Sequence, residues 1–341
     1  MANPQPFRTP PGRAPALPPA AAATATTTTS AMNHMSHPDA PFPAPNALAA
    51  ATTSHTQRRF LISTRKLPIS KSGAIDALTE RIGIPMPEMI FGDNVASVRH
   101  VPSGWSIEFN TPDALDAVDK TDRCVLKVAY ARDWESTREG TTAGIKEVVK
   151  PYDWSYSTTY RGTVQQQQQQ QQQPSQGQPA AATAATAGQA PSFQPTDKKI
   201  PIELLKRRDP ILFFDEVVLY ESELDDNGIS LYSVKVRVHA QRMLLLCRLF
   251  MRLDNVIVRI RDTRVYVDFD TDEVLREYTE KESNFDDVKK ALVMSGRLPD
   301  DVTIGLRDPN ILDPLLKVVE QKTDSISLAH VSSPATAGYG T

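Results

Sequence analysis

The chain has 341 residues and a formal net charge of −3 at pH 7, which argues against a general nucleic-acid binder because that class carries a basic footprint. No apolar run approaches the roughly 20 residues that cross a bilayer, and the start of the chain lacks the apolar segment of a secretory signal. Two cysteines, Cys124 and Cys247, are too few for a disulfide framework or a zinc site and indicate a reducing compartment. We therefore expect no membrane and no nucleic acid among its partners.

Two segments have the composition of disordered chain. Residues 1–57 are mainly Ala, Pro, Thr and Ser and contain too little apolar surface to offset the entropy of ordering. A glutamine tract and the Ala, Gln, Thr and Pro that follow it form a second such segment over residues 165–196. Because strand patterns resume after it, this segment is predicted to be an insertion inside one domain. That domain is expected over residues 58–322, followed by a flexible tail at 323–341.

The first elements of the domain are predicted to be short. Residues 60–65 alternate in polarity as a strand does, and Ser72 is predicted to cap a helix that Gly83 ends. Two prolines at 85 and 87 stop any helix there. The apolar run 89–91 then predicts a buried strand, and Gly92, Asp93 and Asn94 predict a tight turn.

Two strands, over residues 95–101 and 105–110, follow that turn. Thr111, Pro112 and Asp113 predict a helix start, with Thr111 as the N-cap residue. A further strand is predicted over residues 125–130. Residues 151–160 are rich in aromatic and hydroxyl side chains, which is typical of a strand or of the rim of a binding site.

Beyond the insertion the pattern predicts a hairpin at Asp226, Asn227 and Gly228 and a tight turn over residues 262–264. Residues 241–253 fit either a helix or a strand, and their length favours a helix. The strands predicted here cover residues 211–220, 231–239, 256–261, 265–269 and 274–278. Helices are predicted over residues 200–208, 285–294 and 310–319.

Strands predominate in this series, and no alternation of strand and helix appears. We therefore predict an α+β fold in a single domain, with largely antiparallel β-sheets and a few short helices.

No phosphate loop, dinucleotide-binding glycine pattern or nucleophile elbow is present, and no cofactor is predicted. Asp93, Asn94 and His100 offer the ligands of a metal-dependent phosphoesterase, which we keep as the alternative function. Such a centre needs more Asp and His residues than the predicted domain supplies. A set of arginines is able to form a groove for an acidic peptide or a phosphate, or simply a solvated basic face: Arg248, Arg252, Arg259, Arg261 and Arg264.

Seven segments that occur in order resemble the TIP-forty-one-like family, the TOR signalling pathway regulators also called TIPRL. Within that family the chain resembles a fungal-type member. The segments cover residues 85–94, 104–110, 113–115, 126–129, 150–156, 213–217 and 262–264. The resemblance runs from Phe60 to Glu282, apart from the insertion. The sequence departs from the family pattern at Asp254 and Asn255, where the family commonly has an Asp-Gly turn. Because Asn tolerates the left-handed conformation that such a turn needs, the turn is expected to form here as well.

The resemblance implies a regulator that is not an enzyme. Members of the family bind catalytic subunits of type 2A and related protein phosphatases, or act through the Tap-type phosphatase-binding protein, and so enter TOR signalling. The implied fold is a compact α+β domain with a cleft that receives the phosphatase, including its C-terminal tail. The implied location is the cytoplasm, with the nucleus as an additional site. An adaptor that works through its disordered arms is a further hypothesis.

The resemblance also implies site residues. Expected partner-binding residues are Asp113, Ile200, Ile260, Asp262 and Arg264. Residues expected to shape the cleft are Glu88, Phe91, Gly92, Asp93, Asn94 and Trp154.

Overall fold

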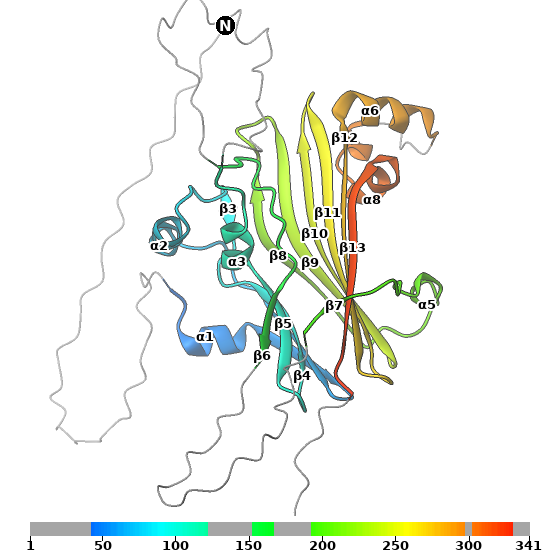
Figure 1. Ribbon diagram of the computed structural model, residues 1–341. Helices are drawn as coiled ribbons and strands as arrows, with labels where there is room; N and C mark the ends of the chain where they lie inside the picture. The colour runs from blue at the N-terminus through cyan, green and yellow to red at the C-terminus, as the bar shows by residue number, and fades with distance from the viewer. Residues whose placement is uncertain (1–41, 122–151, 167–191, 297–301, 330–341) are drawn as a thin grey trace, which may run out of the picture. The chain divides into compact units, whose positions relative to one another are not determined.

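Two antiparallel β-sheets account for most of the described chain (Figure 1). This computed structural model describes residues 42–121, 152–166, 192–296 and 302–329, which all belong to one compact unit. The small sheet has the strand order β1-β2-β4-β5-β6, and the large sheet has the order β3-β8-β9-β10-β11-β12-β13-β7. The predicted α+β fold with antiparallel sheets is confirmed.

The small sheet is built from short strands whose buried and exposed residues alternate. Its members are β1 (Thr52–Gln57), β2 (Phe60–Arg65), β4 (Val95–His100), β5 (Trp105–Asn110) and β6 (Thr163–Gln166). In β5 the side chains of Trp105, Ile107 and Phe109 are buried, and the residues between them are half-buried. This period of two is what the sequence predicted for β2, β4 and β5.

The large sheet is a meander of long strands, because β8 to β13 pair in chain order. Its members are β3 (Met89–Ile90), β7 (Gln194–Pro195), β8 (Phe213–Ser222), β9 (Gly228–Val238), β10 (Arg242–Leu253), β11 (Ile257–Asp268), β12 (Glu273–Asn284) and β13 (Lys317–Ser327). The predicted hairpin joins β8 to β9. A Cβ added to Gly228 would lie 1.9 Å from the carbonyl oxygen of Arg252, so only glycine fits there.

Short helices occupy both sides of the large sheet. They are α1 (Pro45–Ala50), α2 (Ser72–Ile82), α3 (Thr111–Asp116), α5 (Ile202–Leu205), α6 (Phe285–Met294), α7 (Val302–Gly305), α8 (Pro309–Leu312) and the 3₁₀ turn η1 (Asp313–Leu315). Gly83 ends α2 in the left-handed region at φ +82°, as predicted. Within the described ranges no helix is long and apolar enough to cross a membrane.

Both predicted N-caps are wrong by one residue. Helix α2 is preceded by Lys71, and Ser72 is its first residue. In α3 the N-cap is Asn110, whose side-chain oxygen accepts the amide hydrogen of Asp113 at 2.9 Å. Thr111 instead donates its hydroxyl to the carbonyl oxygens of Phe91 and Leu219, which ties α3 to the large sheet.

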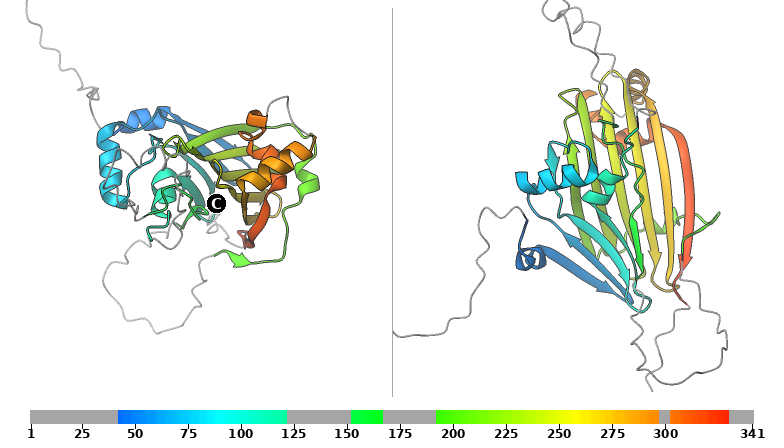
Figure 2. Two further views of the ribbon diagram at one scale, coloured as in Figure 1. Left: turned by 90° about the horizontal axis from the view of Figure 1, so that it is seen from above. Right: turned by 60° about the vertical axis from the view of Figure 1, so that its left-hand side comes forward.

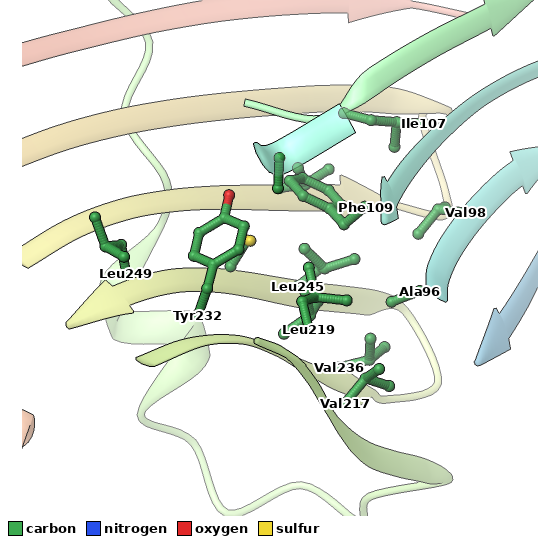
Figure 3. Close-up of a cluster of buried hydrophobic side chains, with 14 of the residues drawn as sticks. Ala96, Val98, Ile107, Phe109, Val217, Leu219, Tyr232, Val236, Leu245 and Leu249 are labelled. Carbon is green, nitrogen blue, oxygen red and sulfur yellow. The ribbon is translucent and has the colours of Figure 1, made fainter. Parts of the chain in front are cut away.

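The main core lies between the two sheets. We call the face of the large sheet that packs on the small sheet the inner face, and the opposite one the outer face. Figure 3 shows side chains of the small sheet, such as Val98 and Phe109, against inner-face side chains such as Leu219 and Leu245. The outer face is covered in part by other elements, since α5 to α8 lie on the side away from the small sheet (Figure 2).

Strand β10 contradicts the helix predicted over residues 241–253. Met243, Leu245 and Leu249 point to the main core, while Phe250 is buried on the outer face. Because both faces of this strand are covered, its apolar residues are nearly continuous, and the period of two is hidden.

Strand β11 contradicts the tight turn predicted over residues 262–264. Asp262 and Arg264 lie in the middle of one continuous strand, which pairs along its whole length with β10 and β12. Charged residues in the centre of a strand resemble a turn in the sequence. The partners that allow them to be buried lie on neighbouring strands and are distant in sequence, so the local pattern does not reveal them.

The C-terminal prediction is also corrected. In place of one helix over residues 310–319, α8 and η1 are followed by β13, which continues to Ser327 and past the predicted tail boundary at 322. Strand β13 is mostly polar, so backbone pairing with β12 positions most of its length, and Ile326 near its end is buried in the main core.

Ordered structure likewise begins before residue 58, since α1 and β1 lie inside the predicted N-terminal tail. Strand β1 pairs with β2 through its backbone and needs no apolar residues to do so. Strands β6 and β7 extend into the two ends of the predicted insertion. The predicted strand at 125–130, most of the insertion and the remaining parts of both tails lie outside the described residues.

Candidate functional site

Strand β11 brings three of the predicted partner-binding residues, Ile260, Asp262 and Arg264, to the outer face. Asp262 is 2% exposed, and Arg248 of β10 holds its carboxylate through two hydrogen bonds of 2.7 and 2.8 Å. Arg264 donates to the same carboxylate at 2.7 Å and to Glu277 of β12 at 3.0 Å. We call Arg248, Asp262, Arg264 and Glu277 the outer-face network.

Strand register places the members of the network. Arg248 lies directly opposite Asp262, and Arg264 lies directly opposite Glu277. Burial favours a lower pKa for the Arg248 guanidinium, but the hydrogen bonds and the charge of Asp262 outweigh it and raise that pKa. Two guanidinium groups therefore neutralise two carboxylates, which is the condition for keeping such charges buried.

Apolar clusters border the network at both ends. Ile260 packs with Phe250 and Val258 beneath α6 and α8, and Ile200 packs with Tyr266 and Leu275. Ile200 and Ile260 are only 3% and 0% exposed, so both support the outer face from below. Arg264, whose side chain is 24% exposed, is the member of this group that reaches the surface most.

Helices α8 and η1 are tied to the same strands by polar contacts. Arg248 donates to the side-chain oxygen of Asn310 at 3.0 Å, and Lys281 pairs with Asp313 at 2.8 Å. Sequence reasoning included Arg248 among possible groove arginines but placed it in a helix, and it did not identify Glu277. The signal that could have identified Glu277 is its position opposite a basic residue, Arg264, on a paired strand.

A pocket of about 330 Å³ opens beside the Ile200 cluster. Its walls combine lysines, acidic residues and apolar side chains: Lys198, Lys199, Pro201, Leu204, Tyr266, Asp268, Glu273 and Leu275. Lys198 forms an ion pair with Glu273 across it. Ile200, one of the predicted partner-binding residues, lies in sequence between the lining residues Lys199 and Pro201.

Asp113 lies apart from the outer-face network, on the side of the small sheet. Its carboxylate accepts hydrogen bonds from Asn110, at 2.9 Å, and from the hydroxyl of Thr163 in β6. Its helix packs into the main core through Ala114 and Leu115. Asp113 therefore joins α3 to the edge of the small sheet, and the structure does not bring it together with Asp262.

The turn at residues 91–94 connects the small sheet to β8. Phe91 donates its amide hydrogen to Leu219, and buried Asn94 accepts from the amide of Leu67 and donates to the carbonyl of Val218. Gly92 donates its amide hydrogen to Ser70. Burial raises the pKa of Asp93, and the nearby charge of Arg65 opposes that shift. The turn is thus held from several sides.

The other predicted cleft residues differ in exposure. Glu88 lies exposed just before β3, and Trp154 is buried against the main core. Neither residue contributes to the outer-face network.

Residues 152–158, part of the segment predicted as a strand or as the rim of a binding site, do not form a strand. They make a buried turn in which Ser155 donates to Asp153 and Tyr156 adopts a positive φ of 54°. Arg259, on the inner face of β11, donates to Ser157 at 2.9 Å. Burial raises the pKa of Asp153, and the hydrogen bonds from Ser155 oppose it. This turn binds the chain before the insertion to the large sheet.

The structure does not assemble the alternative phosphoesterase site. Asn94 precedes β4 and His100 ends it, so the two residues are separated by about 20 Å of extended chain. His100 is instead hydrogen-bonded to Ser103 at 2.8 Å. Within the described ranges no group of three or more His, Cys, Asp or Glu residues is arranged to hold a metal ion.

Comparison with known proteins identifies relatives in animals and fungi. The model of the TIP41-like family matches residues 89–289, which is more than half of the chain. A human TIP41-like protein is 41% identical over 224 residues, covering 65% of this chain and 74% of the relative. Type 2A phosphatase activator TIP41 of Saccharomyces cerevisiae is 37% identical over 242 residues, covering 67% and 62%. Type 2A phosphatase activator tip41 of Schizosaccharomyces pombe is 32% identical over 261 residues, covering 76% and 92%. The chain belongs to the TIP41-like family.

Proposed function

We propose that this protein is a regulator, not an enzyme, that binds catalytic subunits of type 2A protein phosphatases and acts in TOR signalling. The observation that carries the proposal is family membership together with the names of the two fungal relatives, which describe type 2A phosphatase activators. The Tap-type phosphatase-binding protein is the second partner that we propose. The proposed location is the cytoplasm, with the nucleus in addition.

The outer face of the large sheet is the surface that we propose for phosphatase contact. Its network holds Arg264 in a fixed position, with one guanidinium nitrogen on Asp262 and another on Glu277. A positioned, partly exposed arginine is well suited to bind a carboxylate of a partner protein. Asp262, Ile200 and Ile260 act from beneath this surface as positioning residues.

Calorimetric titration of the purified protein with a type 2A phosphatase catalytic subunit tests the proposal. We expect saturable binding that Arg264→Ala weakens about tenfold, or about 1.4 kcal/mol. Lys120→Ala is the charge-matched control, because the ion pair that Lys120 forms with Asp116 is exposed. Absence of binding by folded wild-type protein would contradict the proposal.

Asp113→Leu belongs in the same titration, since Asp113 lies on the other side of the large sheet from Arg264. Loss of affinity in both variants would mean that the phosphatase contacts both sides. Deletion of residues 1–41 together with residues 167–191 separates the regulator from the adaptor hypothesis, because binding through the domain survives the loss of both arms. Turnover of a generic phosphate ester that Asp93→Asn abolishes would instead favour the phosphoesterase.

A further inference from the structure

A basic and apolar surface extends from residue 198 to residue 214, over α5 and the start of β8. Apolar side chains in it are 36–53% exposed, and they are Ile202, Leu204, Ile211, Leu212 and Phe214. Single exposed apolar residues are ordinary, but neighbouring ones mark a surface that binds something. We call these residues, with the basic residues among them, the 198–214 surface.

Hydrogen bonds and strand register make this surface continuous. The buried guanidinium of Arg242 donates to the carbonyl of Leu204 at 2.6 Å and to the carboxylate of Asp209 at 2.5 Å. On the outer face, Phe214 lies opposite Arg237, and Arg237 lies opposite Leu244. Leu244 packs into the apolar cluster that also contains Ile200. The apolar residues of α5 and of β8 are therefore parts of one surface.

The charge of this surface is opposite to that of the whole chain. Residues 198–214 contain five basic and two acidic residues, whereas the chain has a net charge of −3. Lys206 and Arg207 pair with Glu203 and Asp209, at 2.8 and 3.7 Å. No ion pair to a described residue is formed by Lys199 or Arg208, which leaves two positive charges for an acidic partner.

The pocket of about 330 Å³ lies at one end of the surface and shares Lys198, Lys199 and Leu204 with it. Leu204, Tyr266 and Leu275 give it an apolar wall, so it has room for an apolar side chain of a partner. A lipid surface would make no use of such a pocket. The exposed carboxylate of Glu203 would also be repelled by the anionic headgroups of such a surface. Both observations favour a protein segment over a membrane.

We propose that the 198–214 surface docks an acidic segment of the phosphatase catalytic subunit. An apolar side chain of that segment enters the pocket beside Leu204, and its carboxylates lie against Lys199 and Arg208. The inference rests on the proposed function, because the partner is the one proposed there. It adds the surface and the chemistry by which that partner is recognised.

Two pairs of variants test this surface by calorimetric titration with a purified type 2A phosphatase catalytic subunit. Leu212→Ser with Phe214→Ser removes apolar area, and Lys199→Glu with Arg208→Glu reverses the two charges that form no ion pair with a described residue. We expect each pair to raise Kd at least tenfold. The charge-reversed pair also loses most of the salt dependence of binding, because screening then has less attraction to weaken.

Matched controls are available on β13 and α6. Val318→Ser with Val319→Ser removes two exposed apolar side chains of β13, and Lys289→Glu with Lys290→Glu reverses two exposed charges of α6. Both controls are expected to bind within about twofold of wild type, since they lie outside the 198–214 surface.

The outcomes separate the inference from the proposed function. If wild type binds the phosphatase and both test pairs bind equally well, the inference is overturned and the proposed function stands. If folded wild type does not bind, both are overturned. Flotation with phosphatidylserine vesicles completes the test. Vesicle binding that the charge-reversed pair loses, while its phosphatase binding is intact, would assign the surface to lipid instead.

Discussion

The two faces of the large sheet differ in chemistry. On the inner face, strands β8 to β10 present apolar side chains to the small sheet. On the outer face, the four charged side chains of the outer-face network lie between two apolar clusters. On these three strands the inner face is stabilised by burial of apolar area, which needs shape but no particular partner. The outer-face network needs each charge opposite its partner. We infer that the apolar inner face of these strands holds the fold together, and we propose that the outer face positions groups for recognition.

The largest effect is expected in the main core between the inner face and the small sheet. Phe109→Ala removes a fully buried ring between the sheets and should lower the free energy of unfolding by about 4 kcal/mol. Denaturant unfolding followed by circular dichroism measures it. At temperatures where the variant is folded, its affinity for the phosphatase should match that of wild type. A loss of affinity with little loss of stability would reverse the roles that we assign to the two faces.

A slightly smaller loss is expected in the outer-face network. Asp262→Ala leaves Arg248 and Arg264 without their shared carboxylate and should cost about 3 kcal/mol, because a buried charge loses its partner. Arg248→Met combined with Asp262→Leu should recover much of that stability, since it replaces charges by apolar groups. The comparison would fail if the double variant were less stable than Asp262→Ala.

In the double variant, phosphatase affinity should stay low although stability returns. Arg264 then lacks the carboxylate that positions it, so stability and binding separate. Equal affinity for the double variant and wild type would show that the network has no part in recognition.

The smallest effect concerns the junction between the small sheet and the β11–β12 hairpin. Burial lowers the pKa of His100. The negative charge of Asp272 opposes this shift, and the positive charge of Arg59 increases it. The folded protein therefore keeps His100 neutral, while in the unfolded chain histidine takes up a proton below about pH 6.5. Stability should fall as the pH decreases from 7.5 to 5.5, until the lowered pKa of folded His100 is reached.

Unfolding of wild type and His100→Gln by denaturant at pH 7.5, 6.5 and 5.5 isolates this contribution. The wild-type curve should fall more steeply with decreasing pH than that of the variant. Parallel curves would mean that His100 is protonated in the folded protein as readily as in the unfolded chain.

The sequence predicted the small-sheet side of the molecule better than the outer face, for a physical reason. Strand β5 is covered on one face, so Trp105, Ile107 and Phe109 alternate with less buried residues and the period is visible. Gly83 at the end of α2 and Asn255 at φ +62° were also predictable, because backbone geometry restricts the residue type at such positions. These features are local in the chain.

Features that depend on distant partners were not predictable in the same way. The turn predicted at Asp262 fails because Arg248 and Glu277 stabilise that charge from two other strands. Strand β13 has few apolar residues and is defined by its pairing with β12. The resemblance led to Asp262 and Arg264 through motifs, but only the register of β10, β11 and β12 explains how they are held.

Hydrogen exchange of the protein alone and with a type 2A phosphatase catalytic subunit would test most directly whether the outer face holds the partner. Residues 198–212 are the most informative, because most of their amides lie outside strands and are expected to exchange readily in the free protein. We predict slower exchange there and around Asn310 in the complex, with little change in α2. Slower exchange confined to α2, α3 and the turn at residues 91–94, with no change at 198–212, would contradict this account.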